Sequence, residues 1–92
     1  MAKVVATIKI MPESLESNLS SIQNSAEEEI KKFAGETQIK TEQEPVAFGL
    51  KALKIIFVMD EDKGSTEKLE ETIKTIPEVK SVETVDVRRA IG

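Results

Sequence analysis

Apolar and polar residues alternate at the start of the chain. From Val4 onward, every second residue up to Ile10 is apolar, which predicts a strand over residues 3–11 with one buried face. Pro12 is expected to end this strand because it has no amide hydrogen to donate. The buried face would consist of Val4, Ala6, Ile8 and Ile10.

The apolar period then changes to steps of three or four residues, which is typical of an amphipathic helix. The stripe continues for about five helical turns and consists of Leu15, Leu19, Ile22, Ala26, Ile30 and Phe33. The helix is expected to begin among Ser14, Ser17 and Asn18, which are all residue types that cap helix amino termini. Gly35 follows the stripe and suits a left-handed cap at the helix end.

Two further strands are predicted in the middle of the chain. Residues 36–44 are mostly polar with a weak alternation, which indicates a short strand or one at a sheet edge. Residues 50–59 are rich in β-branched and aromatic residues, and Lys54 is the only charged residue between Leu53 and Met59. We therefore expect a central strand whose two faces are both largely covered.

A second helix follows the polar turn at residues 60–64. Ser65 or Thr66 is expected to cap it, and Pro77 to end it. Its buried stripe would be Leu69, Ile73 and Ile76.

The last strand is predicted over residues 79–89. Its apolar phase changes between Val82 and Val85, which indicates a β-bulge. The order strand, helix, strand, strand, helix, strand is that of a ferredoxin-like α+β sandwich, in which a four-stranded antiparallel sheet carries two helices on one face. We expect residues 1–92 to form a single domain, because the chain is short and no linker interrupts it.

The composition narrows the classes of function. Absence of cysteine and histidine excludes thiolate nucleophiles, the commonest general base and the commonest zinc ligand. A net charge of −4 and only three aromatic residues disfavour binding to nucleic acid or to an anionic membrane. The acidic turn resembles a calcium loop only in part, since Gly64 stands where a ligand is required. We therefore expect a protein that is not an enzyme and that holds no cofactor or metal.

One connection between strands is apolar where a polar one is usual. In residues 45–50 the aromatic Phe48 stands between Pro45 and Gly49. Two interpretations are open, because Phe48 could fold back into the core or could be an exposed anchor for a protein partner. Arg88 and Arg89 also have two interpretations: they protect a sheet edge, or they contact an acidic partner or a phosphate.

The chain resembles the archaeal translation elongation factor 1 beta family over nearly its whole length. Four segments carry the resemblance in the family's order: residues 4–12 (VVATIKIMP), 44–53 (EPVAFGLKAL), 60–64 (DEDKG) and 85–89 (VDVRR). The second segment is the specific one, because a Pro-Val-Ala-Phe-Gly turn before a buried strand is uncommon. The family's exchange domain is ferredoxin-like, in agreement with the order of elements above.

This resemblance implies a cytoplasmic guanine-nucleotide exchange factor. Its partner would be the GTPase elongation factor 1 alpha, from which it would promote GDP release so that GTP can bind. In eukaryotic relatives the phenylalanine of the P-x-x-F-G turn enters an apolar pocket on the GTPase. That role would belong here to Phe48, with Pro45 and Gly49 fixing the turn.

The carboxyl end departs from the eukaryotic pattern. Eukaryotic relatives direct a lysine near this end toward the magnesium site, whereas this chain ends Arg89-Ala90-Ile91-Gly92. Arg88 or Arg89 is the candidate for the corresponding contact. The first strand begins almost at Met1, so we expect the bare exchange domain. The alternative interpretation is a small ferredoxin-like interaction or regulatory module without exchange activity.

Overall fold

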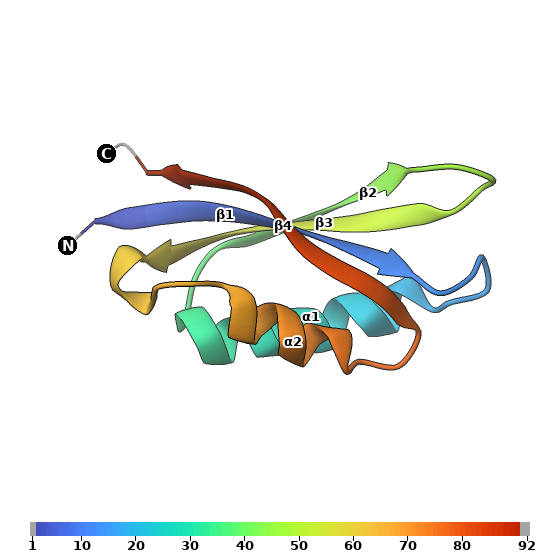
Figure 1. The fold of residues 1–92 in the computed structure, drawn as a ribbon, viewed down its shortest axis with the longest axis horizontal. Coiled ribbons are helices and arrows are strands. Elements are labelled where there is room, and N and C mark those ends of the chain that lie inside the picture. Colours follow the sequence, from blue (N-terminus) through green and yellow to red (C-terminus); the bar gives the residue numbers. More distant parts are fainter. Residues whose placement is uncertain (1, 91–92) are drawn as a thin grey trace.

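A computed structural model describes residues 2–90. Its elements are β1 (Lys3–Pro12), α1 (Leu19–Ala34), β2 (Ile39–Pro45), β3 (Lys51–Asp60), a 3₁₀ turn (Glu61–Lys63), α2 (Glu67–Lys74) and β4 (Val79–Arg89). The strands form one sheet in the order β2-β3-β1-β4, and every neighbouring pair is antiparallel. Both helices lie on the same face of this sheet (Figure 1). The predicted ferredoxin-like sandwich is therefore confirmed.

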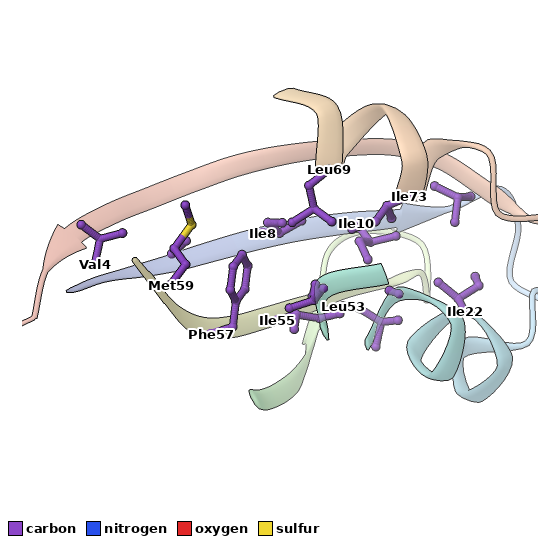
Figure 2. Packing of buried hydrophobic residues seen from close by; sticks show 14 residues of the cluster. Val4, Ile8, Ile10, Ile22, Leu53, Ile55, Phe57, Met59, Leu69 and Ile73 are labelled. Atoms are coloured by element: carbon purple, nitrogen blue, oxygen red, sulfur yellow. The ribbon is translucent and has the colours of Figure 1, made fainter. Parts of the chain in front are cut away.

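The core lies between the two central strands and the helices. The side chains that the alternation placed on the inner face of β1 are all buried. On β3, Leu53, Ile55, Phe57 and Met59 are buried on the same side. Figure 2 shows Phe57 extending from β3 into the layer that Leu69 of α2 also enters. Burial of such side chains supplies most of the free energy that stabilises a domain of this size.

The expectation that both faces of the third strand are largely covered is confirmed for the inner face, whereas the outer face is covered only in part. Ile56 and Val58 point away from the helices and are only half-buried. The reason is architectural, because both helices cover one face and no other layer formed by residues 2–90 covers the opposite one. The β-branched residues indicated a central strand correctly, but they did not report how many of its faces are covered.

The first helix begins later than the apolar stripe predicts. Asn18 caps it, since its side-chain oxygen accepts a hydrogen bond from the Ser21 amide at 3.0 Å. Leu15 therefore lies in the preceding loop and is exposed. At the other end, Gly35 has a φ of 81° and its amide donates to the Lys31 carbonyl, but its ψ of −169° lies outside the left-handed helical region predicted for this cap.

The second helix also differs slightly from the expectation. Thr66 stands at its N-cap position, but the Glu67 amide donates to the Ser65 hydroxyl instead. The helix ends at Lys74, so Ile76 packs against the core from the turn that follows and not from the helix. No helix in the described part of the chain is long and apolar enough to cross a membrane.

The pairing of β1 with β4 contains two register shifts. Thr7 pairs with Asp86 and Ile8 with Thr84, which leaves Val85 without a partner and confirms the predicted bulge. Pro12 was expected to lie just outside the first strand, but it is the last paired residue of β1, opposite Val79. A proline is tolerated there because the end of a strand no longer requires an amide donor.

Candidate functional site

Phe48 lies at the tip of the β2–β3 hairpin. The turn from Ala47 to Leu50 is closed by a hydrogen bond from the Leu50 amide to the Ala47 carbonyl at 2.9 Å. Its central residues, Phe48 and Gly49, have φ angles of 54° and 82°, both in the region that a type I′ turn requires. Glycine adopts this region freely, whereas a bulky side chain does so at a cost of roughly 1–2 kcal/mol.

The structure excludes the interpretation in which Phe48 folds back into the core. Its side chain is 95% exposed, whereas Phe57 on the following strand is fully buried and Phe33 packs against the core. Phe48 is therefore outside the core. An aromatic side chain that is exposed buries no apolar surface that would offset the strain of its backbone.

Glu44 connects the strand that leads into the turn to its neighbours through two partly exposed ion pairs. Its carboxylate lies 3.3 Å from the Lys54 ammonium and 3.6 Å from the Lys9 ammonium. The hydrogen bond from Lys54, followed by the charge of Lys54, holds the pKa of the Glu44 carboxyl below its usual range. Pro45 comes directly after Glu44 and ends β2.

We predict that Glu44→Gln lowers the thermal midpoint by a few degrees at most near neutral pH. The Glu44 carboxyl has a lower pKa in the folded chain than in the unfolded one. The stabilisation of the fold by the ionised Glu44 carboxylate is therefore complete above the ordinary carboxyl pKa. It is lost as the pH falls through the lowered pKa of the folded chain. The melting curves of the unmodified protein and of the Glu44→Gln variant should consequently converge in acid, and also at high salt. A difference that persists unchanged in acid would contradict this account.

Leu15 contacts the same turn from the loop between β1 and α1. A Cβ atom added at Gly49 would lie 3.2 Å from Leu15 Cδ2, so the leucine side chain lies directly against the turn backbone. A hollow of about 230 Å³ separates the rest of this loop from the hairpin, with Leu19, Gln43 and Leu50 in its walls. Sequence reasoning missed this contact, because the helical stripe assigned Leu15 to the core. Asn18 was the signal that could have shown otherwise, since a helix that it caps leaves Leu15 in the loop.

Arg88 and Arg89 lie at the opposite end of the sheet. Arg88 pairs with Val5 and Arg89 with Val4, whereas the hairpin turn precedes Lys51 at the other end of β3. The ten residues of β3 separate the two places by roughly 30 Å, at about 3.3 Å per residue.

The two arginines also point to opposite faces of the sheet, since they are neighbours on one strand. Arg88 binds Asp86 at 2.8 Å, and Arg89 binds Glu61 of the 3₁₀ turn at 3.0 Å. Both side chains remain largely exposed on β4, which is an edge strand. The structure thus brings together Pro45, Phe48 and Gly49 but not the arginines. Ile91 and Gly92, which complete the end that departs from the eukaryotic pattern, lie outside the described residues.

Comparisons with known proteins agree with the fold and give it a family context. The model of the EF-1 guanine nucleotide exchange domain matches residues 5–90. Elongation factor 1-beta of Methanobrevibacter smithii is 42% identical over 90 residues, which cover 97% of this chain and 98% of that protein. Elongation factor 1-beta of Methanocaldococcus jannaschii is 42% identical over 93 residues, covering 98% of this chain and 100% of that protein.

Solved structures show the same sandwich in proteins of other origin. The de novo designed protein Foldit4 is similar with a TM-score of 0.64 at 21% identity, and the match covers 98% of each chain. The ACT domain from GTP pyrophosphokinase of Chlorobium tepidum is similar with a TM-score of 0.56 at 25% identity, covering 90% of this chain and 99% of that one. These likenesses concern the fold alone.

Proposed function

The chain belongs to the EF-1 guanine nucleotide exchange domain family, and from this premise we propose that it accelerates GDP release from elongation factor 1 alpha in the cytoplasm, so that GTP can bind. In this proposal residues 1–92 act as one exchange domain. The observation that carries it is the exposed Phe48, held on a turn with two positive φ angles. Such a residue is suited to enter an apolar pocket on a protein partner.

The proposed mechanism is displacement and involves no bond chemistry. The factor binds the GTPase in a conformation that holds nucleotide weakly. Linkage requires that bound nucleotide lowers the affinity of the GTPase for the factor by the same ratio as the factor lowers its affinity for nucleotide. GDP therefore leaves the ternary complex, and incoming GTP later releases the factor. This cycle needs an anchor and a stable sandwich, both of which the chain supplies without histidine or cysteine.

Arg88 and Arg89 provide a second proposed contact, about one strand length from Phe48. Arg89 already forms an ion pair with Glu61, in which Nη2 lies 3.0 Å from Oε1. A carboxylate or phosphate of the partner would have to compete with this surface ion pair, which is weak because its members are exposed to solvent. The partner would thus have to extend along the sheet to contact Phe48 and either arginine at once.

The test is the release of fluorescent GDP from purified elongation factor 1 alpha. We expect substoichiometric amounts of this protein to raise the release rate in proportion to their concentration, because each molecule acts repeatedly. Chelation of magnesium provides the positive control, since it shows that the loaded GTPase can release its nucleotide. An unchanged release rate at every ratio, including an excess of the factor, would refute the exchange function and favour the interaction module.

A further inference from the structure

Leu15 is presented by a turn of its own, close to the Phe48 turn. The Ser17 amide donates to the Ser14 carbonyl at 3.2 Å, and the Ser14 amide donates in return to the Ser17 hydroxyl at 3.1 Å. The Glu16 amide donates to the Ser14 hydroxyl at 3.2 Å. These bonds close a four-residue turn whose second residue is Leu15, with 66% of its side chain exposed. An ordered turn therefore keeps a leucine in water.

Exposed apolar side chains gather in these two neighbouring turns. Leu15 contacts the backbone at Gly49, which is the neighbour of Phe48. Val46 adds a third exposed apolar side chain, and its amide is held by the Leu50 carbonyl at 2.9 Å. Among the described residues, five large hydrophobic side chains are exposed, and three of them lie in these two loops: Leu15, Val46 and Phe48. We refer to these three residues as the apical surface.

We propose that Leu15 is a second apolar contact with elongation factor 1 alpha, so that the whole apical surface, and not Phe48 alone, docks on the GTPase. This inference rests on the proposed exchange function. Proximity supports it, since Leu15 touches the turn that presents Phe48 and any partner that buries Phe48 comes within reach of Leu15.

Exchange assays with Leu15→Ser test this inference against a neighbouring control. We expect Leu15→Ser to lower the acceleration of GDP release at limiting factor concentration by about fivefold to tenfold, through a weaker complex. Glu16→Ala changes an exposed polar residue of the same turn and should stay within about twofold of the unmodified protein. The thermal midpoint of both variants should be nearly unchanged, because neither side chain is buried.

Hydrogen exchange provides a second measurement that does not depend on the variant's stability. The amides of residues 14–17 in the unmodified protein should gain protection when elongation factor 1 alpha is added. Normal exchange activity of Leu15→Ser, or the absence of this protection, would overturn the role of Leu15. If Phe48→Ala is inactive at the same time, the proposed exchange function still stands. Inactivity of the unmodified protein would instead refute the exchange function itself.

Discussion

Phe48→Ala is expected to lower the acceleration of GDP release about 30-fold, which corresponds to ~2 kcal/mol of binding to the GTPase. The expected loss is large because an exposed aromatic anchor that becomes fully buried in a partner is the typical hot spot of an interface. The free energy of unfolding should remain within about 0.5 kcal/mol of the unmodified protein, since the side chain makes no contact with the core.

Two measurements on the same preparation check this prediction. The GDP-release assay gives the loss of activity, and urea unfolding gives the change in stability. A variant with full exchange activity would show that Phe48 is not an anchor. A loss of several kcal/mol in stability would show instead that the side chain is part of the core in solution, contrary to its exposure here.

Phe57→Ala is the matched substitution in the same hairpin and should have the opposite effect. Phe57 is fully buried on the inner face of β3, where it is paired with Ala6 on one side and Ile39 on the other. Its truncation should remove about 3–5 kcal/mol of stability through the lost transfer free energy and the cavity that remains. A small domain has only about 5–15 kcal/mol in total, so the variant should be partly unfolded at modest temperature.

Urea titration measures this loss as a lower midpoint with an unchanged slope. Exchange activity should fall only in proportion to the unfolded fraction, and it should recover when the variant is assayed at about 10–20 °C, where stability is typically greatest, or with a stabilising osmolyte. A stability loss below about 1 kcal/mol would show that the core closes around the missing ring. The two phenylalanine variants together separate binding from folding.

Most of the fold could be predicted because the spacing of the apolar residues and the positions of the capping residues indicate the same helices and strands along the chain. The alternation of β1 and the edge position of β2 follow from residues that act locally. Leu15 was assigned wrongly because the helical period continues through it, and a period does not specify where the helix begins. The sequence offers Asn18 as one of three candidate caps, and the hydrogen bond that selects it is visible only in three dimensions.

The candidate site could be predicted only in part. The sequence did not determine whether Phe48 is exposed, because residues 45–50 would permit a turn that folds inward or outward. The separation of Phe48 from Arg89 follows from the antiparallel order, which places a β2–β3 hairpin and the end of β4 at opposite ends of the sheet. The contact between Leu15 and Gly49 joins loops that are 34 residues apart, as 49 minus 15 shows, and no local pattern reports such a contact.

The positive φ of Phe48 has a consequence for how this sequence can change. Asparagine or glycine would occupy that backbone conformation with less strain, so selection for stability alone would replace the phenylalanine. The phenylalanine therefore occupies a backbone conformation that its own side chain disfavours. Under the proposed function, stability and activity favour different residues at this position, whereas at the core positions of β3 they favour the same residues.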